Sequence, residues 1–91
     1  MHVNNKIIEL QIHHHIKQTQ LHIEFYETKL NRIIRLKNID LENEPFSFNK
    51  KEHKRWEKEI ENYDKEIKDT NLLIDEERKS LEELMQMLKD K

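Results

Sequence analysis

Histidines are the most obvious candidates for metal chemistry in this sequence. His13, His14 and His15 are consecutive, and His22 follows them. In a helix, consecutive side chains point about 100° apart, so three successive histidines cannot converge on one ion. No two histidines have the i, i+4 spacing that allows chelation from one helix face. We therefore predict no metal site and expect a solvated polar face.

Two of these histidines are predicted to respond to pH instead. If the chain folds back on itself, as argued below, His13 and His15 approach an acidic stretch that ends at Glu77. Nearby carboxylates favour the imidazolium form of histidine. We therefore predict that His13, His15 and Glu77 form a pH-sensitive group, and that stability falls when higher pH removes the imidazolium proton.

Positive charge gathers on both sides of Pro45. The basic residues of this predicted tip are Arg32, Arg35, Lys50, Lys51, Lys54 and Arg55, and Trp56 follows them. Such a region can bind phosphates while the aromatic ring stacks on a base. Acidic residues dilute the tip, however, and the formal net charge of the chain is −2. Nucleic-acid binding is therefore an alternative and not the leading hypothesis.

The sequence contains no group of residues with the spacing of a catalytic site. It has no nucleophile–base pair, and with no glycine and no cysteine it has neither a phosphate-binding loop nor a thiolate. We expect a non-enzymatic protein without a cofactor. A minimal enzyme formed only on dimerisation is a further alternative. The short length and helical class are similar to those of the helical chorismate mutases, but their arginine-centred active-site pattern is absent.

Composition and periodicity predict two long helices. Charged residues make up 40% of the chain and apolar residues 34%, which is typical of solvated helices with a thin core. Heptad positions recur in the second half at Trp56, Ile60, Tyr63, Ile67, Thr70, Ile74, Glu77, Leu81, Leu84 and Leu88. The first half repeats the pattern at Ile12, Ile16, Thr19, Ile23, Tyr26, Leu30 and Ile33.

Pro45 separates the two helical patterns, because proline disfavours helix at the residue before it. We predict one all-α domain over residues 1–91, with helices at about residues 4–38 and 50–90 and a turn at about 39–49. Asn49 is expected to cap the second helix. The short turn favours an antiparallel coiled-coil hairpin. One suitable register sets Leu30 beside Tyr63, and a slip of one heptad remains open.

Several apolar residues lie outside the heptad pattern and predict association. They are Leu10, Leu21, Phe25, Leu72 and Leu73. In the register above, Leu21 lies level with Leu72, and a contiguous exposed apolar surface usually marks an interface. We expect it to be covered by a second copy, giving a homodimeric four-helix bundle, or by another protein.

The function expected from these features is protein–protein interaction through a helical face, as an adaptor, an assembly subunit or a small inhibitor. The abundance of lysine, isoleucine and asparagine resembles that of proteins from AT-rich bacteria and their phages, which implies a phage-type regulator as one variant. No apolar run reaches the ~20 residues that span a bilayer. We therefore expect a cytoplasmic protein without membrane contact.

Overall fold

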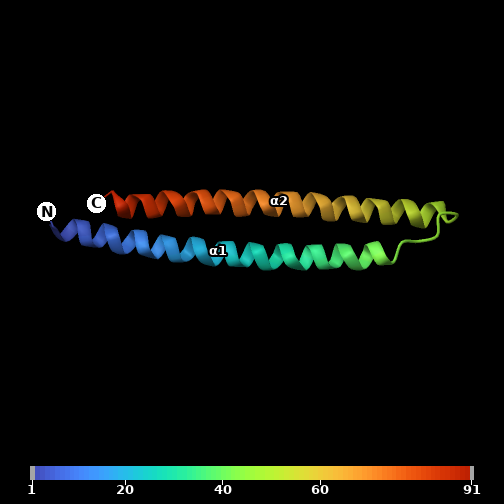
Figure 1. The fold of residues 1–91 in the computed structure, drawn as a ribbon, viewed down its shortest axis with the longest axis horizontal. Helices are drawn as coiled ribbons and strands as arrows, with labels where there is room; N and C mark the ends of the chain where they lie inside the picture. Colours follow the sequence, from blue (N-terminus) through green and yellow to red (C-terminus); the bar gives the residue numbers. More distant parts are fainter. Residues whose placement is uncertain (1, 91) are drawn as a thin grey trace.

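Two long antiparallel helices form the computed structural model, which describes residues 2–90 and the side chains of residues 5–90. Helix α1 spans His2–Glu42 and helix α2 spans Lys50–Lys89, and residues 2–90 contain no strand. The helices lie side by side in a rod measuring 75 × 15 × 14 Å (Figure 1). The predicted all-α, antiparallel two-helix hairpin is confirmed.

The turn is shorter than predicted, because α1 continues past Asn38 to Glu42. Asn43 ends the helix by hydrogen bonding to two of its last carbonyls. Its backbone N–H donates to the Asp40 oxygen at 3.2 Å, and its side-chain amide donates to the Ile39 oxygen at 2.8 Å. Pro45 disfavours helix only at Glu44, so it does not prevent these additional residues from being helical.

Asn49 caps the start of α2, as predicted from the sequence. Its side-chain oxygen accepts a hydrogen bond from the backbone N–H of Glu52 at 3.4 Å. This contact satisfies one of the N–H groups that have no partner within the first turn of a helix. The cap therefore defines where the chain returns to helix after the turn.

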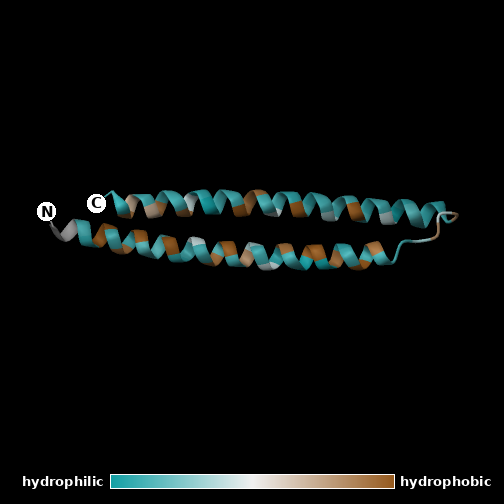
Figure 2. Cartoon of the chain, viewed as in Figure 1, coloured by the Kyte–Doolittle hydropathy of each residue, from teal (hydrophilic) through white to brown (hydrophobic). Residues whose placement is uncertain are grey.

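The side chains facing the opposite helix, called the seam below, keep the heptad spacing throughout. The most buried members are Ile12, Thr19, Ile33, Thr70 and Ile74, with exposed fractions of 2% to 8%. The hydroxyl of Thr19 donates to the His15 carbonyl at 2.8 Å, so its burial leaves no unsatisfied donor. Hydrophobic residues recur along both helices, more densely on α1 (Figure 2).

Polar contacts between the helices show a register one heptad away from the predicted one. Arg78 lies 2.9 Å from Glu27, His22 lies 3.6 Å from Glu77, and Lys37 pairs with Asp64. These contacts set Leu30 level with Thr70 and not with Tyr63. The specific pairing of Leu30 with Tyr63 is therefore wrong, and the alternative of a one-heptad slip is correct.

This register staggers the two helices at both ends of the rod. The first turns of α1 extend past the end of α2, and the first turns of α2 extend past the end of α1 (Figure 1). The turn therefore continues past the end of α1, beside the first turns of α2, before the chain reverses into α2 (Figure 1). Residues near Trp56 consequently pack against the turn and the end of α1.

The register can be tested by cross-linking, because the chain contains no cysteine of its own. Leu30→Cys combined with Thr70→Cys should give an intramolecular link with a short bismaleimide. Leu30→Cys combined with Tyr63→Cys should give little, because one heptad displaces the second thiol by about 10 Å along the helix. Mass spectrometry of the monomer band measures the yields, and the reverse order of yields would contradict this register.

Candidate functional site

The structure does not bring the histidine triplet to the acidic stretch of α2. His13, His14 and His15 are exposed, and the ring of His22 is the one that approaches Glu77, at 3.6 Å. The predicted pairing of His13 and His15 with Glu77 is corrected, because the shift of one heptad brings a different turn of α1 opposite Glu77. Within residues 5–90, no group of three or more histidine, aspartate or glutamate side chains could hold a metal ion.

His15 and Glu77 nevertheless line the same groove between the helices. The groove has a volume of about 470 Å³, and His22, Leu84 and Met87 also line it. The Glu77 side chain is 27% exposed and belongs to the seam by its spacing. The ring of His22 at the seam margin gives this carboxylate a polar neighbour that an apolar seam alone would not supply.

The predicted basic tip is divided into two parts. Lys50, Lys51, Lys54 and Arg55 lie in the first two turns of α2, beside the turn. Arg32 and Arg35 lie well inside α1, since that helix continues to Glu42 and α2 starts beyond its end. With about 1.5 Å of rise per residue, the stagger separates the arginines from Lys50 by more than 20 Å. The residues do not form one continuous basic surface.

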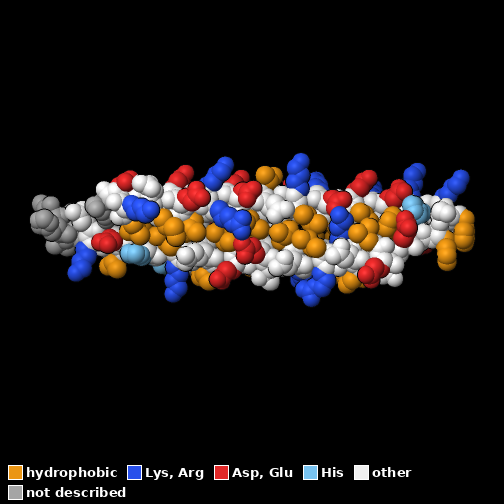
Figure 3. Space-filling view, viewed as in Figure 1, with side chains coloured by type: hydrophobic (Ala, Val, Ile, Leu, Met, Phe, Trp, Pro, Cys, Tyr) orange, Lys and Arg blue, Asp and Glu red, His pale blue; other side chains and the backbone are white. Residues whose placement is uncertain are grey.

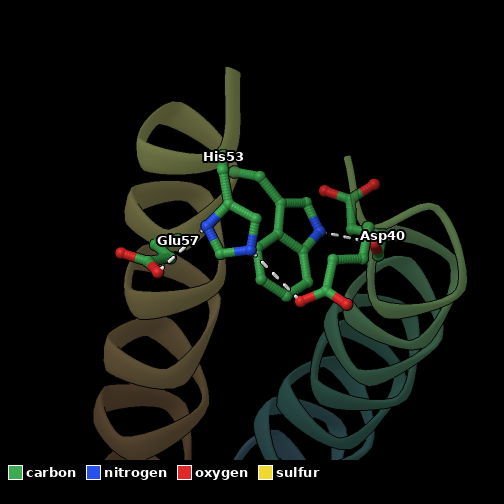
Figure 4. A network of polar contacts seen from close by, with 5 residues as sticks. Asp40, His53 and Glu57 are labelled. Atoms are coloured by element: carbon green, nitrogen blue, oxygen red, sulfur yellow. Dashed lines mark hydrogen bonds and ion pairs between the residues drawn. The ribbon is translucent and has the colours of Figure 1, made fainter. Parts of the chain in front are cut away.

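Trp56 is engaged within the hairpin and does not project from it. Its indole N–H donates a hydrogen bond of 2.7 Å to the carbonyl of Asp40, in the last turn of α1 (Figure 4). That carbonyl also accepts a hydrogen bond from the backbone N–H of Asn43, so the tryptophan adds a second hydrogen bond at the end of α1 from the other helix. This contact favours a structural role for Trp56 and opposes the predicted stacking on a base.

A polar cluster surrounds Trp56 and joins the turn to α2. The imidazole of His53 stands with its centroid 5.3 Å from that of the indole. Its two ring nitrogens lie 3.3 Å from a carboxylate oxygen of Glu44 and 3.1 Å from one of Glu57 (Figure 4). A neutral ring can donate to only one of these carboxylates, whereas imidazolium can donate to both. The sequence interpretation missed His53, although it lies one heptad before Ile60.

Asp40 also accepts a hydrogen bond from the hydroxyl of Tyr63. Burial beside the seam raises the pKa of Tyr63 above its ordinary value of 10.0, and the hydrogen bond and negative charge of Asp40 raise it further. Lys37 and Asp40 thus continue the seam of α1 beyond Ile33 as charged positions. The heptad spacing from Ile33 was the signal that would have found them.

Two phenylalanines of the turn are more exposed than any other large apolar residue of the described chain. Phe46 is 75% and Phe48 81% exposed, and their rings stack with centroids 5.3 Å apart and planes 12° from parallel. Lys50 and Lys51 follow directly in the chain. The sequence interpretation treated these phenylalanines as turn residues and proposed no role for them.

The predicted partner-binding residues are all exposed, but they do not form one surface. Leu10, Leu21 and Phe25 belong to α1, and Leu72 and Leu73 belong to α2. The register sets Leu21 level with residues near Arg78 and not with Leu72. Helix geometry also points Leu21 and Leu72 away from each other, toward opposite edges of the rod. The expected contiguous stripe across both helices is therefore corrected to separate surfaces.

One surface lies along α1 opposite the seam, and Figure 3 shows apolar side chains on this outer edge. This outer stripe consists of Ile7, Gln11, His14, Gln18, Leu21, Phe25, Thr28, Arg32, Arg35 and Ile39, all of them exposed. It contains no carboxylate up to Ile39, and Glu42 follows at the same spacing as the last residue of α1. Phe25, Thr28, Lys29 and Arg32 also line a hollow of about 370 Å³. Their spacing of i, i+3, i+4 and i+7 is that of the four residues that receive a side chain in a coiled coil.

The corresponding line on α2 has a different chemistry. It consists of Lys51, Arg55, Lys58, Asn62, Lys65, Asp69, Leu72, Glu76, Lys79, Glu83 and Gln86. Leu72 is its single apolar member, and most of the others are charged. A helix face of this composition is stable in water, whereas the outer stripe of α1 exposes Leu21 and Phe25 at its centre and Ile7 and Ile39 near its ends.

Comparisons with protein-family models, with curated proteins and with solved structures find no match to this chain. Neither helix, over residues 2–90, has an apolar stretch long enough to cross a membrane. Functional inference therefore depends on the surfaces described above.

Tyr63 predicts a specific alkaline sensitivity. The raised pKa means that the unfolded chain releases the phenolic proton at lower pH than the folded chain. The stability that Tyr63 contributes is therefore present below about pH 10 and is lost as pH rises through the folded-state pKa. Urea unfolding from about pH 9 to 11.5 should show a smaller loss in Tyr63→Phe than in the wild type.

Tyr26→Phe is the matched control for this measurement, since Tyr26 occupies the corresponding seam position on α1. It should retain the full alkaline loss of stability. A pH profile of Tyr63→Phe that runs parallel to the wild type would contradict the proposed contact with Asp40.

Proposed function

We propose that this chain is a non-enzymatic protein–protein interaction module that docks through the outer stripe of α1. The observation that carries the proposal is the contrast between the two helices. The outer face of α2 is charged, whereas the outer stripe of α1 has Leu21 and Phe25 exposed at its centre by 48% and 66%. A long helix with apolar residues on two opposite faces is typically covered on both.

Apolar residues are exposed along the whole of α1, both within the stripe and beside it. Ile7, Ile8, Leu10, Ile34, Leu36, Ile39 and Leu41 are each between 38% and 66% exposed. Isolated apolar side chains are common on protein surfaces, but a series along one helix favours an interface. Helix-in-groove and helix-on-helix recognition both use such a series of i, i+3, i+4 and i+7 contacts. An adaptor, an assembly subunit or a small inhibitor of the phage type would use the stripe in this way.

The polar groups of the hairpin support a binding role over a catalytic one. His53, Asp40 and Tyr63 are engaged with partners from the turn, α1 and α2. The contacts of His53 with Glu44, and of Asp40 with Trp56 and Tyr63, join one part of the hairpin to another, and the contact of His53 with Glu57 lies within α2. Their arrangement favours a rigid scaffold that presents α1, and the proposal assigns no reaction and no cofactor to the chain.

Substitution of the stripe tests the proposed function. Leu21→Glu with Phe25→Glu should abolish capture of an associated protein from an extract of the source cells, because docking would bury unpaired carboxylates. Both residues are exposed, so circular dichroism should show unchanged helix content. Leu72→Glu is the matched control on α2 and should capture the same protein as the wild type.

Equal capture by the wild type and the stripe variant would contradict docking through α1. Loss of capture by Leu72→Glu alone would instead assign the interface to α2. Quantitative mass spectrometry of the captured proteins distinguishes these outcomes.

Nucleic-acid binding at the turn is the second candidate, favoured by the exposed stacked pair of Phe46 and Phe48. Aromatic rings stack on unpaired bases, and Lys50, Lys51 and Lys54 lie near enough in the chain to contact phosphates. Glu44, Glu52 and Glu57 weaken this surface by their opposite charge. The candidate therefore ranks below protein binding.

Fluorescence anisotropy with a single-stranded oligonucleotide at about 150 mM salt tests this candidate. Phe46→Ala with Phe48→Ala should weaken binding by about tenfold or more, the loss expected for removing stacking on one or two bases. Lys50→Glu with Lys54→Glu should weaken it further, whereas Lys79→Glu on the far part of α2 should not. Absence of binding by the wild type would exclude the candidate.

A further inference from the structure

We infer that the outer stripe of α1 binds a second copy of this chain, antiparallel to the first, about a two-fold axis that passes α1 near Ile23. This inference rests on the proposed function and names its partner. It is carried by the order of residues along the stripe, by the area available and by the distribution of charge.

The surface area of the hairpin exceeds that of a compact protein. The chain exposes 7799 Å² at a mass of 11.3 kDa, whereas a compact monomer of that mass exposes about 5,700 Å². The excess is about 2,000 Å². A stable interface buries about 800 Å² on each partner. The rod as a whole therefore has enough surface for a full interface while the seam stays intact.

The apolar residues of the stripe are placed symmetrically about Ile23. Leu21 and Phe25 lie equally far on either side of it, and so do Ile7 and Ile39 near the two ends of α1. A two-fold interface brings each residue against its symmetric counterpart in the second copy. Leu21 then meets Phe25 at the centre, and Ile7 meets Ile39 at each end. Every apolar member of the stripe finds an apolar partner.

The polar residues of the stripe follow the same symmetry. Gln18 pairs with Thr28, His14 with Arg32, and Gln11 with Arg35 of the second copy. Gln18 thereby lies over the hollow between Phe25 and Arg32, where Thr28 and Lys29 offer hydrogen-bonding groups. Along the line of contact each polar residue has a polar symmetric counterpart, and Gln18 also borders Phe25 at the hollow.

Charge determines the orientation of the two copies. In a parallel pair each residue faces its own copy, so Arg32 would face Arg32 and Arg35 would face Arg35. The stripe contains no carboxylate to compensate this repulsion. The antiparallel pair separates these arginines and sets them against neutral glutamine and against histidine. Electrostatic repulsion therefore disfavours the parallel arrangement.

Residues beside the stripe extend the contact at its ends. Ile8 and Leu36 are 44% and 40% exposed and lie on the same flank of α1. The antiparallel pairing brings Ile8 of one copy close to Leu36 of the other, next to the pair formed by Ile7 and Ile39. In this dimer each α1 lies between its own α2 and the α1 of the second copy. The charged outer face of each α2 remains in water.

The mass of the wild-type chain in solution is the first test. Light scattering after gel filtration at micromolar concentration should give twice the mass of one chain. Leu21→Glu with Phe25→Glu should weaken dimerisation by about 100-fold or more, because each contact would bury an unpaired carboxylate. Leu72→Glu should remain dimeric. A monomeric wild type, or a dimer unaffected by the stripe variant, would overturn the inference.

Cross-linking tests the orientation. A mixture of His14→Cys chains and Arg32→Cys chains should form covalent heterodimers with a short bismaleimide. Either variant alone should form few, since its two copies lie about 27 Å apart along an antiparallel pair. Efficient linking of each variant to itself would show a parallel pair and would overturn the two-fold arrangement proposed here.

The outcomes separate this inference from the proposed function on which it rests. A monomeric chain that still needs Leu21 and Phe25 to capture a different protein overturns the second copy as partner and supports the interaction module. A chain that neither dimerises nor captures a protein through the stripe overturns both.

Discussion

The arrangement of side chains in this hairpin depends on its register, which is the alignment of α1 against α2 along their one line of contact. Two helices bury little, and the buried apolar residues of the described chain are only Ile12, Ile33 and Ile74, with 3% to 5% exposure. An apolar heptad seam alone admits several registers that differ by one heptad. Polar contacts at the turn end distinguish them: Lys37 pairs with Asp64, and Asp40 accepts hydrogen bonds from Trp56 and Tyr63. Polar side chains near a seam commonly specify register in this way.

The fold could be predicted from the sequence because its signals are local and repetitive. Heptad spacing is a property of each helix alone, and Pro45 and Asn49 mark the turn by their own backbone and side-chain chemistry. The start of α2 was accordingly predicted to the residue. The end of α1 was not, because Asn43 caps it through its own backbone and side chain at a position where no glycine marks the stop.

The register and the sites that depend on it could not be predicted from the apolar pattern. A slip of one heptad still sets heptad positions of one helix against heptad positions of the other. The apolar spacing alone therefore does not distinguish the two registers. The difference lies in specific polar pairs across the seam, which the apolar pattern omits. Moving the register by one heptad exchanged His22 for His13 and His15 beside Glu77 and separated Leu21 from Leu72. The errors at Glu77 and in the alignment of Leu21 with Leu72 therefore share one physical origin.

Association would stabilise the hairpin, because the outer faces of the two helices differ in composition. Because α2 presents a charged outer face, adding a partner to that side would require desolvating charges, whereas covering the outer stripe of α1 removes apolar surface from water. A partner that binds only the folded hairpin stabilises it by mass action. A thin seam that buries few residues would benefit from that contribution more than a thick core would. The helix with the denser hydrophobic residues (Figure 2) would then also supply the interface that completes the hairpin.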